Sequence, residues 1–237
     1  MTKFSVTPLY LQVRDSLAER IAAQAWKANT ALPNETDLAK EMDVSPGTMR
    51  KALDLLEVEG LVTRKQGRGT YVNDFTSPSM VSRYSNFRST SGERVIGNIE
   101  VLNCFEGNAD YMECKQLQLK TDARVYQIQR RRSYMGKSFM FETVSLPAAL
   151  FPGLSERGLE SSGLTKIASA YGILLGSAAE TVAAGAPSAA AQRALHIIGT
   201  SPILALDRVI SARDGTPLQW RIAECRKTDD LKYIVET

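Results

Sequence analysis

The chain has 237 residues, of which 43% are hydrophobic and 23% are charged; this balance excludes a disordered or fibrous protein and leaves room for two globular domains. Three widely spaced cysteines and one histidine exclude a disulfide framework and a Cys/His zinc cage, and every apolar run is far shorter than the roughly 18 residues of a membrane span. The formal net charge is +3, but residues 1–74 carry ten basic and ten acidic side chains, so bulk charge does not indicate a nucleic-acid partner.

The first clear pattern predicts a helix over residues 8–26. Apolar side chains recur every four residues on one of its faces, at Leu9, Val13, Leu17 and Ile21. A second, short helix is expected after Pro33, from Glu35 to Glu41, with Leu38 and Ala39 facing inward.

A third helix is predicted from Pro46 to Glu59. Ser45 is a favourable N-cap, Pro46 suits the first helical turn, and Gly60 suits the position just past the end. The apolar residues lie three and four positions apart and predict one buried face, made of Met49, Ala52, Leu53 and Leu56. Thr48, Arg50 and Lys51 are therefore expected to point away from the core.

A β-hairpin is predicted next, because two β-prone runs, residues 61–64 and 69–73, flank a tip that contains Gly67. The only charged side chains from Gly60 to Asn73 are Arg64, Lys65 and Arg68, all of them basic. Three helices, with a short turn between the second and the third, followed by a hairpin, are the layout of a winged helix-turn-helix.

The residue types at the third helix and the hairpin tip fit contact with double-stranded DNA. The hydroxyls of Ser45 and Thr48 and the helix N–H groups can meet phosphate, as can Lys51, while Arg50 can donate two hydrogen bonds to one guanine. The candidate contacts of the tip are Arg64, Lys65, Gln66, Gly67, Arg68 and Gly69, whose glycines let the backbone approach phosphates. The alternative is a capped surface helix and a hairpin tip whose charges are merely solvated.

Residues 74–91 are predicted to be a linker between a first domain, residues 1–73, and a second, residues 92–237, because eight of these 18 residues are Ser or Thr. The second domain is expected to be α+β, with helices on one side of a largely antiparallel sheet. Its predicted strands cover residues 95–105, 125–134, 139–146, 179–184, 203–211 and 218–225, and its predicted helices cover residues 164–171 and 188–197.

The basic run Arg130-Arg131-Arg132 is a candidate ligand site. Alternate residues of a strand face the same way, so Arg130 and Arg132 should share one face, where two guanidinium groups suit a carboxylate or a phosphate. Glu142, on the following strand, is expected either to bind a ligand hydroxyl or ammonium group or to neutralise an arginine. The alternative is a solvated basic strand.

Several motifs resemble those of the GntR family of bacterial transcription regulators. They are residues 32–39 (LPNETDLA), 44–56 (VSPGTMRKALDLL), 59–62 (EGLV) and 66–72 (QGRGTYV), and the resemblance covers about Pro8 to Asn73. The second half resembles the UTRA effector domain of the HutC branch, which has a chorismate-lyase-like fold. That resemblance is carried by the strand with Arg130 and Arg132, by Glu142, and by residues 150–154 (LFPGL) and 215–217 (GTP).

The resemblance implies a homodimer that places the third helix of each protomer in a DNA major groove and each wing at the minor groove, under the control of a small molecule. It adds Thr36 to the candidate DNA contacts, although Thr36 and Pro46 stand where many members carry Arg. It also adds Gln219 to the effector site. Because Gln219 stands where members often carry Glu and has no negative charge, an amino-sugar ligand is disfavoured.

We therefore expect a cytoplasmic DNA-binding regulator, a repressor, that has no catalytic residues, no metal and no cofactor. Its expected partners are an operator, a second copy of the chain, and a metabolite that bears a carboxylate or phosphate, with no membrane partner. Two other functions are kept as alternatives: a chorismate-lyase-like enzyme acting on a carboxylated metabolite, and a DNA-binding protein that responds to no effector.

Overall fold

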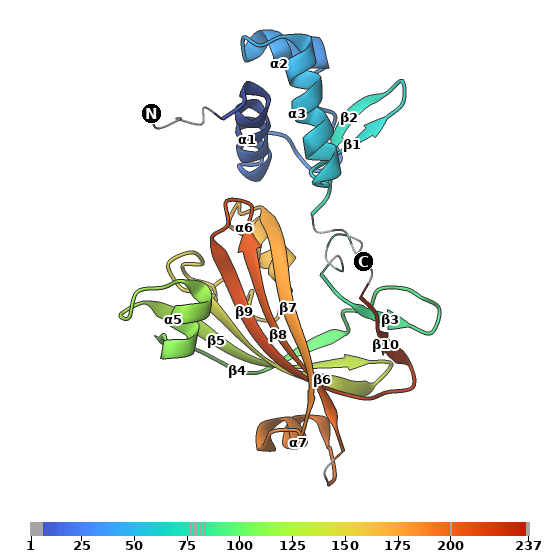
Figure 1. Ribbon diagram of the computed structural model, residues 1–237, viewed down its shortest axis with the longest axis vertical. Helices are drawn as coiled ribbons and strands as arrows, with labels where there is room; N and C mark the ends of the chain where they lie inside the picture. The colour runs from blue at the N-terminus through green and yellow to red at the C-terminus, as the bar shows by residue number, and fades with distance from the viewer. Residues whose placement is uncertain are drawn as a thin grey trace, which may run out of the picture. The chain divides into compact units, whose positions relative to one another are not determined.

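The computed structural model describes residues 7–75, 77, 80, 82, 84–199 and 201–235. Two compact units divide the chain, the first ending at Ser77 and the second holding nearly all of the remainder. In the described part of the chain, the first unit begins with three helices, α1 (Leu9–Ala22), α2 (Glu35–Glu41) and α3 (Pro46–Val58). They are followed by an antiparallel hairpin of β1 (Val62–Lys65) and β2 (Gly69–Val72), as Figure 1 shows. These elements confirm the predicted winged helix-turn-helix.

The three helices enclose one apolar core. Its fully buried side chains come from the faces predicted for each helix, with Leu17 from α1, Leu38 from α2, and Met49 and Leu53 from α3. Leu9 was expected on the same face, but it is 52% exposed because it stands at the first position of α1.

Local caps set the ends of these helices. The hydroxyl of Ser45 accepts a hydrogen bond from the backbone N–H of Thr48 at 3.1 Å, as expected of an N-cap, and Gly60 follows α3 with a φ of 71°. The prediction that the first helix runs to Trp26 was wrong by four residues. Gln24 adopts a left-handed conformation, with a φ of 57°, and the N–H of Ala25 bonds back to the carbonyl of Arg20, which ends the helix.

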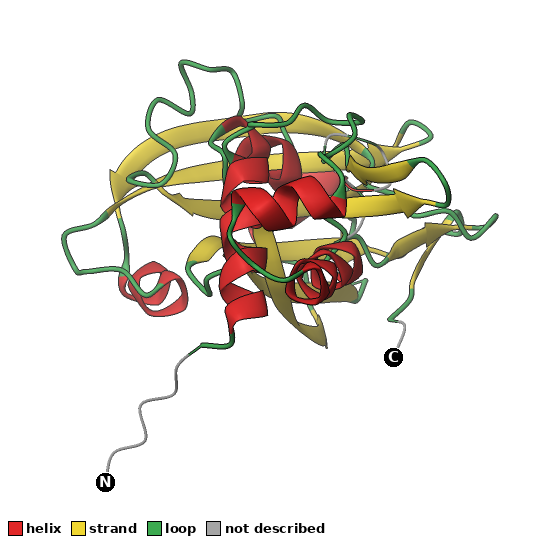
Figure 2. Cartoon of the chain, turned by 90° about the horizontal axis from the view of Figure 1, so that it is seen from above, coloured by secondary structure: helices red, strands yellow, loops and turns green. Residues whose placement is uncertain are grey.

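The second unit is built on a six-stranded antiparallel sheet in the order β4-β5-β6-β9-β8-β7, within the described residues. Its long strands are curved and twisted, as the yellow arrows of Figure 2 show. The strands are β4 (Asn98–Asn108), β5 (Arg124–Tyr134), β6 (Lys137–Pro147), β7 (Leu175–Gly185), β8 (Ile203–Ala212) and β9 (Pro217–Arg226). The α+β class and the antiparallel sheet are confirmed.

Helices cover both faces of this sheet, so the expectation of helices on one side was wrong. The helix α5 (Tyr111–Leu117) packs on Val125 and Trp220, and α7 (Ala189–Leu195) packs on Phe141, which faces the same way. The helix α6 (Leu164–Ala170) begins beside Arg130 on the opposite face. Apolar patterning shows that a helix is buried but not on which face of a sheet it packs.

A short two-stranded ribbon lies within the same unit. Its strands are β3 (Phe87–Ser89) and β10 (Leu231–Tyr233), which pair antiparallel although more than 140 residues separate them in the sequence. Phe87 contacts the rings of Phe139 and Tyr233 edge to face, at 5.1 and 5.2 Å between ring centroids. Residues 87–89 belong to the stretch expected to be a linker, yet they are buried; residues 76, 78, 79, 81 and 83 of that stretch lie outside the described residues.

Candidate nucleic-acid interface and ligand pocket

The N-terminal end of α3 presents the side chains expected to contact DNA. Arg50 is 66% exposed, and Lys51 is exposed with its Nζ 3.8 Å from the centroid of the Tyr10 ring. The hydroxyls of Ser45 and Thr48 lie 2.9 Å apart and hydrogen-bond to each other. Thr36 is exposed in the first turn of α2.

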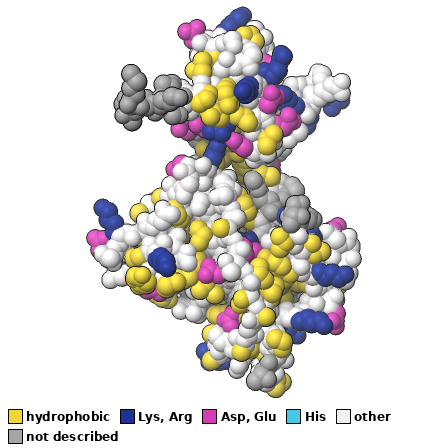
Figure 3. All heavy atoms as spheres, viewed as in Figure 1, with side chains coloured by type: hydrophobic (Ala, Val, Ile, Leu, Met, Phe, Trp, Pro, Cys, Tyr) yellow, Lys and Arg dark blue, Asp and Glu magenta, His cyan; other side chains and the backbone are white. Residues whose placement is uncertain are grey.

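Arg64 connects the hairpin to α3. Its Nη1 forms an ion pair with Asp54, and its Nη2 donates to the backbone carbonyl of Arg50 at 3.2 Å. Glu35 of α2 joins the same cluster, because its carboxylate lies 3.1 Å from Nε of Arg50 and 3.4 Å from Nη2 of Arg64. Basic and acidic side chains accordingly lie intermingled on the N-terminal unit in Figure 3. The helix tip and the base of the hairpin thus form one surface.

The tip of the hairpin projects exposed polar groups. Lys65, Gln66, Gly67, Arg68 and Gly69 are all exposed, and Gly67 adopts a φ of 71° that favours glycine. Nζ of Lys65 lies 4.4 Å from the centroid of the Tyr71 ring. The structure therefore brings the predicted cations of the tip to the surface, next to the α3 cluster anchored by Arg64.

A small cavity of about 50 Å³ opens on the sheet face that bears Arg130 and Arg132. Both arginines and Gln219 line it, and all three are buried or nearly so, while Arg131 points to the other face and bonds Glu100 at 2.6 Å. Glu142 is fully buried beside them. The predicted alternation along β5 is confirmed, and the four residues expected at a ligand site lie together.

Glu142 accepts a hydrogen bond from Arg132 and forms ion pairs with Arg132 and Arg221. Its Oε1 lies 2.8 Å from Nη2 of Arg132, and its Oε2 lies 3.6 Å from Nη1 of Arg221. Burial works to raise the pKa of Glu142, but the attraction of Arg132, Arg130 and Arg221 outweighs it and lowers that pKa to about 2. Of the two roles predicted for this carboxylate, the contacts match the neutralisation of arginines.

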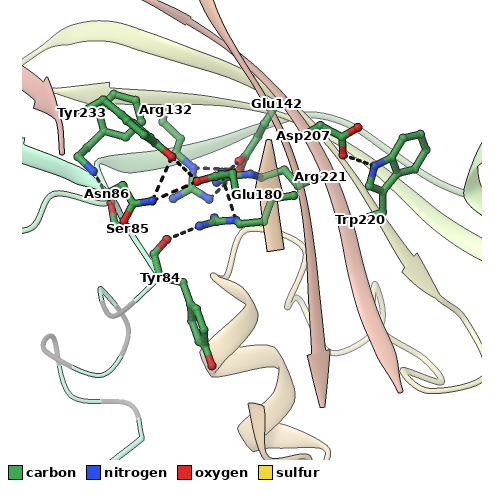
Figure 4. A network of polar contacts seen from close by, with 12 residues as sticks. Tyr84, Ser85, Asn86, Arg132, Glu142, Glu180, Asp207, Trp220, Arg221 and Tyr233 are labelled. Atoms are coloured by element: carbon green, nitrogen blue, oxygen red, sulfur yellow. Dashed lines mark hydrogen bonds and ion pairs between the residues drawn. The ribbon is translucent and has the colours of Figure 1, made fainter. Parts of the chain in front are cut away.

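Sequence reasoning missed three charged residues of the pocket: Glu180, Arg208 and Arg221. The carboxylate of Glu180 lies 2.8 Å from Nη2 of Arg221 and 3.5 Å from Nε of Arg208, and it also accepts bonds from Asn86 and Tyr233 (Figure 4). A signal was present, since Arg208 and Arg221 occupy inward-facing positions of strands that are otherwise mostly apolar on that face.

Burial also perturbs other groups of the pocket. Desolvation lowers the pKa of Arg130 to about 10 and that of Arg208 to about 9, so both stay protonated at neutral pH. Burial also raises the pKa of the thiol of Cys225, which lies on β9 outside the lining of this cavity, to about 12, so this thiol is unreactive at neutral pH.

Within the described ranges, no group of three or more His, Cys, Asp or Glu side chains is arranged to hold a metal ion. None of the helices in this part of the chain is both long and apolar enough to cross a membrane.

Two family models match the chain: that of the bacterial regulatory proteins of the gntR family, over residues 9–72, and that of the UTRA domain, over residues 97–229. The mannosyl-D-glycerate transport/metabolism system repressor MngR of Escherichia coli (strain K12) is 30% identical over 229 residues, which are 96% of this chain and 95% of that protein.

Solved structures share the fold at lower identity. The possible transcriptional regulator YydK of Bacillus subtilis subsp. subtilis str. 168 has a TM-score of 0.58 and 16% identity, covering 98% of this chain and 100% of that one. PhnF from Mycobacterium smegmatis has a TM-score of 0.53 and 23% identity, covering 90% of this chain and 94% of that one.

Proposed function

Because the chain belongs to the GntR family of bacterial regulatory proteins and carries a UTRA domain, it is a DNA-binding transcription regulator, and we propose that it is a homodimeric repressor released by a small anionic metabolite. Relatives named as repressors, MngR among them, support the direction of regulation. Two protomers would read two halves of a near-palindromic operator.

The observation that carries the proposal is the bond between Arg64 and the backbone of Arg50, which joins the hairpin to α3. Through it, one duplex can meet the N-terminal end of α3 and the exposed hairpin tip together. Arg50 would contact a base, Ser45, Thr48 and Lys51 would contact phosphates, and the tip would follow the backbone beside them. Thr36, at the start of α2, would add a further hydroxyl.

The acidic side chains of this surface set the energetic balance of binding. Glu35 holds both Arg50 and Arg64, and DNA has to displace it before these arginines can bind phosphate or guanine. Such partly exposed ion pairs are worth about 1 kcal/mol, which a single charge-assisted bond to DNA offsets. Glu35 therefore pre-positions the two arginines and competes only weakly with DNA for them.

The arginine pocket supports the second part of the proposal. Arg130, Arg132 and Gln219 line the cavity and would bind the effector, while Glu142 would hold Arg132 in place. An effector can shift operator binding only if it prefers one arrangement of the chain, and a coupling of roughly 1–3 kcal/mol suffices for a several-fold to hundredfold change in operator affinity.

Selection from a random duplex library with the full-length chain tests DNA recognition. We expect enrichment of a near-palindromic sequence, and in gel shifts on it Arg50→Ala should weaken binding by about 1–3 kcal/mol and relax one base position. Lys27→Ala, at an exposed lysine outside the proposed surface, is the matched control. Failure to enrich any sequence, or full affinity in Arg50→Ala, would contradict the assignment.

A thermal-shift screen of metabolites, on the wild type and on Arg130→Ala, tests effector control. A ligand that stabilises only the wild type and releases the operator in a gel shift would support the proposal. Turnover of a carboxylated metabolite would favour an enzyme instead, and the absence of any stabilising metabolite would favour a regulator without an effector.

A further inference from the structure

Four arginines line the cavity, and the strand order places them in two pairs. Arg130 and Arg132 lie on β5, whereas Arg221 lies on β9 and Arg208 lies opposite it on β8. The strand between the two pairs is β6, which contributes Glu142. At about 4.8 Å between neighbouring strands, the backbones of β5 and β8 lie roughly 14 Å apart, and the long side chains of Arg130 and Arg208 reach the same cavity from these two strands.

Two carboxylates oppose these four cations. Within the described part of the chain, Glu142 contacts Arg132 and Arg221, and Glu180 contacts Arg221 and Arg208. Four positive charges less two negative charges leave two positive charges uncompensated at a buried site. Such charges are costly without a partner, which makes the site selective for anions.

One uncompensated charge is that of Arg130. This side chain is 1% exposed, no described carboxylate lies within ion-pair distance of it, and its Nη1 donates to the carbonyl of Ser162 at 2.7 Å. Its Nε and Nη2 have no hydrogen-bond partner among the described residues. Arg130 therefore offers two buried donors to a ligand.

The other uncompensated charge is that of Arg208. This residue stands at the end of a series of ion pairs that runs from Arg132 through Glu142, Arg221 and Glu180. Arg208 shares Glu180 with Arg221, which lies closer to that carboxylate, and Nε of Arg208 makes no hydrogen bond to a described residue. Its Nη1 donates to the backbone carbonyl of Tyr84. Arg130 and Arg208 are thus anchored to different segments, at the carbonyls of Ser162 and Tyr84. Figure 4 shows the ion pairs among Arg132, Glu142, Arg221 and Glu180.

We propose that the ligand of this pocket carries two separate anionic groups, carboxylate or phosphate, one bound at Arg130 and the other at Arg208. This inference rests on the proposed function and specifies the class of its effector.

A cavity of about 50 Å³ has room for roughly four waters, which is space for one anionic group. The second anionic group of the ligand replaces the backbone carbonyl of Tyr84 as the hydrogen-bond acceptor of Nη1 of Arg208. Because Tyr84 lies in the stretch of residues 74–91, this exchange gives the ligand a direct effect on the chain that leads to the DNA-binding unit.

Calorimetric titration of the full-length chain with matched ligands tests the proposal. The two-group ligands are succinate and 3-phosphoglycerate, and their one-group counterparts are butyrate and glycerol 3-phosphate, all at equal ionic strength. At least one two-group ligand should bind roughly tenfold tighter than its counterpart, as expected of one additional charge-assisted contact.

Two variants assign the groups. Arg208→Gln should reduce the affinity of the two-group ligand to that of its counterpart and leave the counterpart unaffected. Arg130→Gln should weaken both, and Arg193→Gln, at an exposed arginine of α7, should change neither. If no two-group ligand binds more tightly than its counterpart, or if Arg208→Gln binds the two-group ligand as the wild type does, the proposal is overturned. A one-group ligand that releases the operator would sustain the proposed function while refuting this inference.

Discussion

Replacing Glu142 by glutamine should destabilise the C-terminal unit strongly, although the two side chains have nearly the same shape. Glu142 is fully buried and contacts Arg132 and Arg221, which are themselves largely buried. The amide of glutamine can still accept one hydrogen bond from Arg132, but it has no charge to balance the two arginines. Glu142→Gln thus leaves two buried cations with one partner fewer.

The expected loss is about 3 kcal/mol. The pKa of Glu142 falls from its ordinary 4.5 to about 2 in the folded chain, and each pH unit of that difference corresponds to about 1.4 kcal/mol of stabilisation of the folded state. The figure agrees with the roughly 3–5 kcal/mol that breaking a buried ion pair costs. Because the folded-state pKa lies below the unfolded one, this stabilisation is complete above about pH 4.5 and is lost as the pH falls toward 2.

Urea unfolding followed by tryptophan fluorescence measures the effect. The chain has two tryptophans, Trp26 in the first unit and Trp220 in the second, so a Trp26→Phe background restricts the signal to the unit that holds Glu142. Trp220 is 8% exposed and donates to Asp207 at 2.7 Å, so its emission should change on unfolding. The free energy of unfolding should be lower in Glu142→Gln at pH 7, and the two proteins should converge near pH 2.

Glu93→Gln, at an exposed glutamate of the same unit, is the matched control and should change the stability by less than about 0.5 kcal/mol. A loss below about 1 kcal/mol in Glu142→Gln, or one of equal size at pH 7 and pH 2, would refute the view that this carboxylate is ionised and balances the pocket.

Three predictions concern the DNA-binding unit. Ser45→Ala removes the N-cap of α3 and should cost about 1 kcal/mol in the free energy of unfolding, measured by urea denaturation; no loss would show that the cap bond is dispensable. Arg68→Ala should weaken operator binding and lower the slope of log K against log salt by about 1 in a fluorescence-anisotropy titration, and an unchanged slope would place the tip away from phosphate. Glu35→Gln should tighten operator binding by up to about 1 kcal/mol in gel shifts, because it releases Arg50 for DNA; weaker binding would instead show that Glu35 is needed to position that arginine.

Local signals were sufficient to predict the DNA-binding unit. Ser45, Pro46 and Gly60 mark the ends of α3 through contacts within a few residues of each, and the apolar spacing identifies its buried face. Along β5, strict alternation sufficed to place Arg130 and Arg132 together. These features depend on neighbours in the sequence, where propensity and periodicity act directly.

Features that depend on distant contacts were missed. The strand β3 is three residues long and is defined by its pairing with β10, and nothing in its own Ser/Thr-rich neighbourhood indicates burial. Glu180 and Arg208 acquire their role from adjacent strands of the sheet. The helix α5 was also absent from the predicted elements, although a local signal for it was present. Asp110 and Glu113 form a capping box, in which each side chain accepts a hydrogen bond from the other's backbone N–H.

Three charged groups inside the pocket have pKa values far from neutral pH. Arg130 and Arg208 titrate near 10 and 9 and Glu142 near 2, and the one histidine of the chain, His196, stands at the end of α7 rather than among the residues lining the cavity. A mild fall in pH below neutrality therefore leaves the charges of these three groups unchanged. It does protonate a phosphate ester, whose second ionisation lies at about pH 6, whereas the carboxyl groups of a dicarboxylate titrate at lower pH and lose less of their charge. Sensitivity of repression to acid stress would thus report the chemistry of the metabolite rather than that of the protein.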